Sequence, residues 1–78
     1  MKILISGLPD SVQEDRLRAA LEMFGEILEV KIFKEGSGPP WALVDFNLTR
    51  IEAITVADKI NGIYHEGRTL GAHVRLHT

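Results

Sequence analysis

Three histidines are the side chains best suited to hold a metal ion or to move a proton, since the chain contains no cysteine. His73 and His77 lie four residues apart in a segment where apolar and polar residues alternate, as they do in a β-strand. Four strand residues span about 13 Å, so the two imidazoles are too far apart to share one ion. His65 lies between Gly62 and Gly67 with no evident partner. We therefore expect no metal site.

Catalytic chemistry is equally poorly represented. Without cysteine the chain has no disulfide, no thiolate ligand and no cysteine nucleophile. No other nucleophile has an evident base beside it, and no glycine-rich anion-binding loop precedes a helix. Four acidic residues fall on the expected outer faces of helices, where solvation explains them: Asp15, Glu22, Glu52 and Asp58. The sequence argues against an enzyme and against a bound cofactor.

The first half of the chain has the pattern of a strand, a helix and a second strand. Residues 2–8 (KILISGL) form a short run rich in β-branched side chains, closed by a Pro-Asp pair. Residues 11–25 carry apolar residues at helical spacing, with Ser11 and Glu14 as a possible capping box and a glycine at the end. Residues 26–34 alternate between apolar and polar side chains, which predicts a half-buried strand.

The second half repeats strand, helix and strand. Residues 35–40 (EGSGPP) have the composition of a loop, and residues 41–46 (WALVDF) resume the strand pattern, so the two flanking strands should form an antiparallel hairpin. Residues 49–60 have helical spacing and stop at an Asn-Gly pair. Residues 70–77 alternate again and predict a last strand with one apolar face.

These elements in the order β-α-β-β-α-β predict an α+β, ferredoxin-like sandwich. Each right-handed crossover places its helix on the same side, so a four-stranded antiparallel sheet should carry both helices on one face and leave the other face open. With 78 residues, the chain is expected to form one domain over residues 1–78.

Composition places the chain among ordinary globular proteins, with 45% hydrophobic and 26% charged residues. No apolar run is long enough for a signal-peptide core or a membrane span. We expect a soluble, intracellular protein, with cytoplasm and nucleus not distinguished. The formal net charge of −2 is the wrong sign for a protein that holds nucleic acid chiefly by neutralising phosphates.

Two short segments on neighbouring strands of this sheet have a familiar form. They are residues 3–8 (ILISGL) and residues 39–46 (PPWALVDF), accompanied by FGEI at 24–27, ING at 60–62 and GRTL at 67–70. In these segments the chain resembles the RNA recognition motif family, whose hexapeptide and octapeptide occupy the first and third strands. The resemblance covers nearly the whole chain and implies binding of single-stranded RNA on the open sheet face.

The positions that contact RNA in the family are only partly matched. Aromatic residues at the second hexapeptide position and at the third and fifth octapeptide positions stack on bases in the family; here those positions hold Leu4, Trp41 and Leu43. The basic residue and the glycine that open the octapeptide are replaced by Pro39 and Pro40. Of the three aromatic positions of the family, only the one held by Trp41 is aromatic in this chain. The phosphate contact that the family's basic residue makes is missing.

Successive side chains of a strand point to opposite faces of the sheet. Once the apolar residues are assigned to the core, the residues between them are expected to face outward. The residues expected to form the RNA-binding face are Lys2, Leu4, Ser6, Lys31, Phe33, Trp41, Leu43, His73, Arg75 and His77. Trp41 and Phe33 are expected to stack on two bases, at roughly 1 to 3 kcal/mol per base. Lys2, Lys31 and Arg75 are expected to meet phosphate or sugar.

Alternatives remain open for the apolar members of this face. In the alternative interpretation of Trp41, its ring packs on the loop prolines and binds no ligand. In the alternative interpretation of Phe33, its ring stabilises the hairpin and contacts no ligand. Leu4 and Leu43 in the centre of an open sheet are also typical of a protein interface. A protein-interaction module that binds a partner, or a second copy of itself, through Leu4, Phe33, Trp41 and Leu43 is therefore the alternative function.

Overall fold

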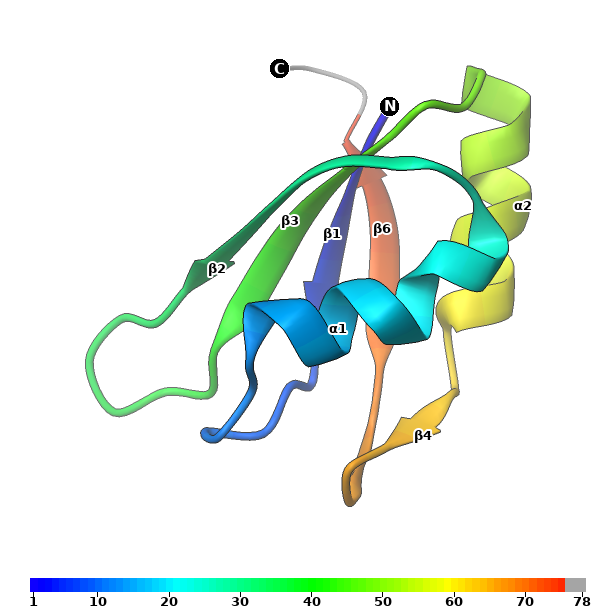
Figure 1. The fold of residues 1–78 in the computed structure, drawn as a ribbon. Coiled ribbons are helices and arrows are strands. Elements are labelled where there is room, and N and C mark those ends of the chain that lie inside the picture. The colour runs from blue at the N-terminus through cyan, green and yellow to red at the C-terminus, as the bar shows by residue number, and fades with distance from the viewer. Residues whose placement is uncertain (76–78) are drawn as a thin grey trace.

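The computed structural model describes residues 1–75, which fold around a four-stranded antiparallel sheet (Figure 1). The strands are β1 (Lys2–Ser6), β2 (Ile27–Phe33), β3 (Trp41–Phe46) and β6 (Gly71–Arg75). Their spatial order is β2-β3-β1-β6, and every neighbouring pair is antiparallel. β1 and β3 therefore form the centre of the sheet. The predicted α+β, ferredoxin-like order of elements is confirmed.

Two helices cover one face of this sheet. They are α1 (Glu14–Leu21), which continues into the 3₁₀ turn η1 (Glu22–Phe24), and α2 (Arg50–Ile60). One set of alternate strand residues packs with the inner sides of both helices into a single core. Its members are Ile3, Ile5, Leu8, Leu17, Leu21, Val30, Ala42, Val44, Phe46, Ala53, Val56, Ala57, Ile60, Leu70 and Ala72. The other set of strand residues forms the opposite, open face.

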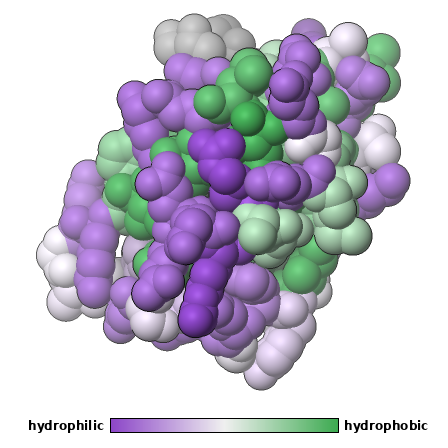
Figure 2. All heavy atoms as spheres, viewed as in Figure 1, coloured by the Kyte–Doolittle hydropathy of each residue, from purple (hydrophilic) through white to green (hydrophobic). Residues whose placement is uncertain are grey.

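The helix side of the molecule is largely polar. Figure 2, drawn from the same side as Figure 1, shows hydrophilic side chains over most of this surface with hydrophobic ones between them. Among the exposed hydrophobic residues are Ile51 and Ile54 of α2, with exposed fractions of 78% and 44%. No helix within residues 1–75 is long and apolar enough to cross a membrane.

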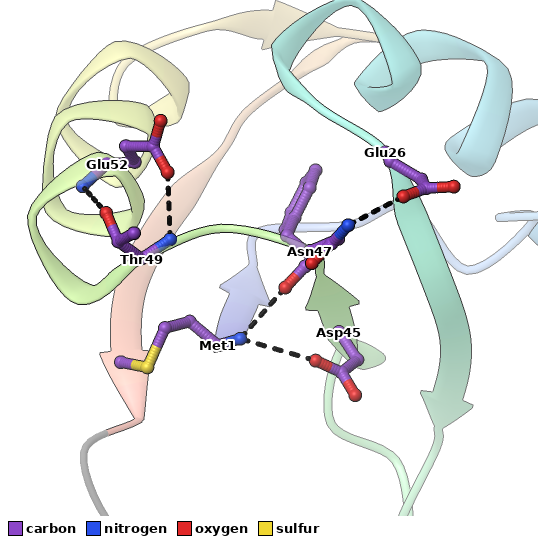
Figure 3. A network of polar contacts seen from close by, with 7 residues as sticks. Met1, Glu26, Asp45, Asn47, Thr49 and Glu52 are labelled. Atoms are coloured by element: carbon purple, nitrogen blue, oxygen red, sulfur yellow. Dashed lines mark hydrogen bonds and ion pairs between the residues drawn. The ribbon is translucent and has the colours of Figure 1, made fainter.

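A small polar network holds the start of β1 against the end of β3 (Figure 3). The Met1 ammonium donates to the Phe46 carbonyl at 2.8 Å and lies 3.5 Å from a carboxylate oxygen of Asp45. In return the Phe46 N–H donates to the Met1 carbonyl at 2.9 Å. Next to them, the Asn47 amide donates to Glu26 at 2.8 Å, which ties β3 to the segment before β2. These bonds thereby hold the end of β3 in register with the start of β1 and with the segment before β2.

The start of α1 differs from the sequence prediction. The helix begins at Glu14, after an extended Gln13, and no side chain caps it. Ser11 instead belongs to a turn closed by the Val12 N–H donating to the Pro9 carbonyl at 3.0 Å. The predicted capping box of Ser11 and Glu14 is therefore wrong, because Glu14 is the first residue of the helix and not its third, as a box with Ser11 would need.

α2 is fixed at both ends. At its start Thr49 and Glu52 form a capping box, with the Glu52 N–H donating to Thr49 Oγ1 at 3.2 Å and the Thr49 N–H donating to Glu52 Oε1 at 2.9 Å (Figure 3). At its end the Asn61 amide donates to the carbonyls of Ala57 and Ala72, and its oxygen accepts from the Ala72 N–H. Asn61 thus joins the helix end to the outer edge of β6.

A short hairpin between α2 and β6 is not predicted from the sequence. Its strands are β4 (Tyr64–His65) and β5 (Arg68–Thr69). Glu66 and Gly67 connect them with φ angles of 49° and 85°, which is the conformation of a tight two-residue hairpin turn. Two-residue strands leave too little periodicity to detect, and the Glu-Gly turn is a weaker signal than Asn-Gly.

Candidate nucleic-acid interface

The open face of the sheet carries nine of the ten side chains predicted to bind RNA. On β1, β2 and β3 the alternation of burial places Lys2, Leu4, Ser6, Lys31, Phe33, Trp41 and Leu43 on this face. His73 and Arg75 lie on it from β6. All nine are half-buried or exposed, whereas Ile3, Ile5, Ala42, Val44 and Ala72 between them are buried. His77 lies outside the described residues.

Strand register arranges these side chains in rows that cross the sheet. The register pairs Glu29 with Asp45, Asp45 with Lys2, and Lys2 with Arg75. These four residues form what we call the charged row. It has carboxylates on β2 and β3 and cations on β1 and β6, so the sign of the formal charge changes along the row.

The middle row is apolar at its centre. Leu43 pairs with Leu4 across the two central strands, and Lys31 and His73 continue the row at the edges. The two leucines are half-buried, although no helix covers this face. They provide an apolar floor in the place where the family motif has aromatic rings.

The third row contains the two aromatic rings. Phe33 and Trp41 are cross-strand partners, and their rings stack with centroids 4.4 Å apart and planes 19° from parallel. This separation is close to the spacing of about 4.8 Å between neighbouring strands. The rings therefore face each other across β2 and β3 and stand upright on the sheet rather than lying flat on it.

An upright stack changes what the two rings can bind. One face of Trp41 is covered by Phe33 and its other face is directed toward β1. The pair also closes the hairpin directly before the loop at residues 34–40, as the alternative for Phe33 predicted. Phe33 therefore covers one face of the Trp41 ring and leaves its other face uncovered.

A hollow of about 380 Å³ lies beside this free face. We call it the Trp41 hollow. Its lining consists of Leu4, Ser6, Gly7, Pro39, Pro40, Trp41 and Arg75. Most of the lining surface is apolar, and Arg75 is its one charged side chain. Trp41 thus lines the hollow together with the loop prolines, and the hollow leaves open space beside its ring.

The predicted set of RNA-binding residues leaves out two groups of residues on this face. Gly7 lines the hollow although it lies outside the strands, and only the tertiary fold brings it beside Trp41, whereas Pro39 and Pro40 directly precede Trp41 in the sequence. Glu29 and Asp45 are carboxylates among the predicted cations. Glu29 lies 3.7 Å from the Lys31 ammonium, so it partly neutralises one of them. Strand alternation already places Asp45 on the outer face, and the same argument could have located Glu29.

A second, smaller hollow of about 260 Å³ lies on the helix side, lined by Arg18, Glu22, Gly25, Glu26 and Ile27. Within it the Arg18 guanidinium donates to the Ile27 carbonyl at 3.5 Å. It contains none of the aromatic residues and none of the predicted site residues. This second hollow therefore offers no surface for base stacking.

Comparison with known proteins agrees with this arrangement. The family model described as RNA recognition motif matches residues 3–71. No curated protein sequence matches the chain significantly.

Solved structures of low sequence identity share the fold. The RRM3 domain of Mip6 has a TM-score of 0.80 at 20% identity, over 92% of this chain and 88% of that chain. The first two RRM domains of the yeast poly(U) binding protein Pub1 give 0.84 at 18% identity, over 100% of this chain and 47% of that chain. The Rna15 RRM with bound RNA (GU) gives 0.79 at 15% identity, over 97% and 83%.

Proposed function

Because this chain belongs to the RNA recognition motif family, we propose that it binds single-stranded RNA on the open face of its sheet. The observation that carries the proposal is the stacked pair of Phe33 and Trp41 on that face, with a free Trp41 surface beside an apolar hollow. Base stacking on an aromatic side chain stabilises a complex by roughly 1 to 3 kcal/mol and tolerates any base.

The proposed contacts divide by row. Trp41 stacks on one base, and Leu4 and Leu43 make apolar contacts with the next one. Lys2 and Arg75 approach phosphate groups or bases from the β1 and β6 side of the charged row, while Ser6, Lys31 and His73 contribute polar contacts at the margins. His77 stays a predicted contact of the same face. This is the chemistry of binding, and we infer no catalytic step.

The direction of the charged row restricts the path of the RNA. Phosphates are repelled by Glu29 and Asp45 and attracted by Lys2 and Arg75, so the backbone is expected to follow β1 and β6. The bases then point toward β3, where Trp41 is located. The similar Rna15 domain was solved with bound RNA (GU), and the yeast relative is named a poly(U) binding protein, which supports single-stranded RNA as the ligand class.

Anisotropy of labelled, randomised five-nucleotide RNAs tests the proposal directly. We expect the unaltered chain to bind them and Trp41→Ala to weaken binding by about tenfold, since a stacking contact is removed. Because Trp41 is the single tryptophan, its fluorescence should also change on binding to the unaltered chain.

Ile51→Ala is the matched control. Ile51 is an exposed apolar residue on the helix side, so its loss should leave RNA affinity unchanged. Equal weakening by both substitutions, or no binding at millimolar protein, would contradict the proposal.

The second candidate function is protein interaction through Leu4, Phe33, Trp41 and Leu43. It is supported by the two carboxylates on the face and by the net charge of −2, both of which disfavour phosphates. Sedimentation of the chain over a range of concentrations distinguishes the two functions. Self-association that is abolished by Leu43→Lys, together with absence of RNA binding, would favour this candidate.

A further inference from the structure

The Trp41 hollow has the form of a compartment for one flat ring rather than of an open platform. Phe33 does not line it, because Phe33 lies on the far side of the Trp41 ring. The opposite wall and floor come from Leu4, Ser6 and Gly7 at the end of β1. A planar group that enters from above would therefore stack on the free face of Trp41.

The size of the hollow suits a single base. Its volume of about 380 Å³ is at the small end of the range for small-molecule sites. At the position of Leu4 the family motif has an aromatic ring on which a base lies flat. Leucine is smaller, and the hollow extends over it. The site can therefore admit a base that stands upright on the sheet, with its edge toward Leu4 and its face against Trp41.

Arg75 is the only charged side chain that reaches this compartment. The backbone of Arg75 pairs with Lys2 at one end of β1, whereas the hollow lies beside Ser6 at the other end. Lys2 and Ser6 are four residues apart, which is about 13 Å at roughly 3.3 Å per residue. Since Arg75 nevertheless lines the same hollow as Gly7 and Pro39, its side chain extends along the face toward Trp41.

The hydrogen-bond donors of Arg75 are available to a ligand. Within residues 1–75 its guanidinium has no ion pair and no hydrogen bond. Pro39 and Pro40 on the neighbouring wall have no N–H to offer. Ser6 supplies the other polar side chain of the lining, so Arg75 is the only lining side chain with two coplanar donors.

We propose that the Trp41 hollow is a guanine-selective subsite in which Arg75 reads the base. This inference rests on the proposed RNA binding and adds the base that the site selects. Guanine presents two adjacent acceptors, O6 and N7, that match the two donors of a guanidinium. Adenine has a donor, N6, in place of O6, so one of the two contacts becomes a clash of donors. Pyrimidines are smaller and fill less of the hollow.

Five-nucleotide RNAs with a single variable centre test the inference. The probes are UUGUU, UUAUU, UUCUU, UUUUU and UUGUU with 7-deazaguanine at the centre, and the measurement is the dissociation constant of each. We expect UUGUU to bind about tenfold more tightly than UUAUU, which is the discrimination of one bidentate pair. Removal of N7 in the 7-deaza probe should abolish most of this preference.

Arg75→Met keeps an unbranched side chain and removes every donor, so the ratio of the UUGUU and UUAUU affinities should fall to near one. Lys2→Ala is the matched control: Lys2 is a cation in the same row that does not line the hollow, so its loss should weaken all five probes and leave the ratio intact. Equal binding of all probes, preference for UUCUU, or a preference for UUGUU that survives Arg75→Met would overturn the inference but leave RNA binding standing. Failure of every probe to bind would overturn both.

Discussion

Trp41 and Phe33 have different roles although both rings lie on the open face. Phe33 covers one side of Trp41 and closes the hairpin, and Trp41 presents its other side to the hollow above Leu4. Two rings that lie flat would accept two bases, whereas an upright pair offers one enclosed stacking surface. The number of aromatic residues on such a face therefore does not give the number of bases that stack.

Glu29 is a residue whose removal should improve RNA binding. It lies 3.7 Å from Lys31 and contributes negative charge to the charged row. At about 10 Å in water, one unit charge changes the interaction with a phosphate by about 0.4 kcal/mol. We expect Glu29→Gln to tighten RNA binding about twofold at low salt, as measured by anisotropy titration. The effect should vanish at high salt because of screening; weaker binding at low salt would contradict this role.

At the scale of elements, α2 is the helix whose attachment determines where the fourth strand lies. Asn61 replaces a neighbouring strand at the outer edge of β6, because its amide pairs with both the N–H and the carbonyl of Ala72 at 2.8 Å. The same amide also donates to the Ala57 carbonyl at 3.1 Å. The position of Arg75 on the open face depends on this attachment.

Asn61→Ala should destabilise the fold by about 2 kcal/mol, since it removes three hydrogen bonds and leaves the Ala72 groups with water as their only partner. Urea unfolding monitored by circular dichroism measures the change. Asn47→Ala is the control, because the exposed Asn47 amide donates a single bond to Glu26 and its loss should cost about 0.5 kcal/mol. Equal costs for the two substitutions would show that Asn61 does not attach β6.

The α2 capping box should make stability depend on pH. Hydrogen bonds from the backbone and then the side chain of Thr49 lower the pKa of Glu52 from its ordinary value of 4.5. The contribution of the carboxylate to stability is therefore complete above about pH 4.5 and is lost as the pH falls through the lower pKa of the folded state. The difference in unfolding free energy between the unaltered chain and Glu52→Ala should be largest at neutral pH and should shrink on acidification.

Thr49→Ala provides a reference for that measurement, because it removes the side-chain contact to Glu52 and keeps the backbone N–H that donates to the carboxylate. In a Thr49→Ala background, the difference made by Glu52→Ala should therefore depend less on pH, but the dependence should not disappear. A difference that stays constant down to about pH 3 in the unaltered background would contradict the capping role.

The sequence predicted the elements better than their ends and contacts. The bounds of β3 followed from the run between Pro40 and Asn47, and the stop of α2 followed from Asn61 and Gly62. The predicted start of α1 was wrong because Ser11 lies in a turn and the helix begins only at Glu14. The residues of the open face followed from the two-residue alternation of side chains along each strand. The Trp41 hollow could not be predicted in this way, since residues of β1, a loop and β6 come together only in the folded chain.

At the scale of the whole molecule, a net charge of −2 coexists with cations on the open face. Three lysine or arginine side chains project from the described strands onto the open face, namely Lys2, Lys31 and Arg75. Binding should therefore depend on stacking and apolar contact more than on release of counterions. The affinity for RNA is expected to be modest and only weakly sensitive to salt.

The slope of log K against log salt measures this balance. For single strands each neutralised phosphate contributes about −0.7, so three cations give a slope of about −2 or shallower. Lys2→Ala should make the slope shallower by about 0.7. A slope of about −4 or steeper would mean that cations away from the open face contact the RNA.

Amide chemical-shift mapping of the ¹⁵N-labelled chain during titration with short single-stranded RNA tests the location of the binding site most directly. The predicted result is a set of saturable shifts at Leu4, Ser6, Trp41, Leu43 and Arg75, with α1 and α2 largely unchanged. Saturable shifts concentrated on the two helices, or a spectrum that RNA leaves unaltered, would contradict RNA binding by the open face.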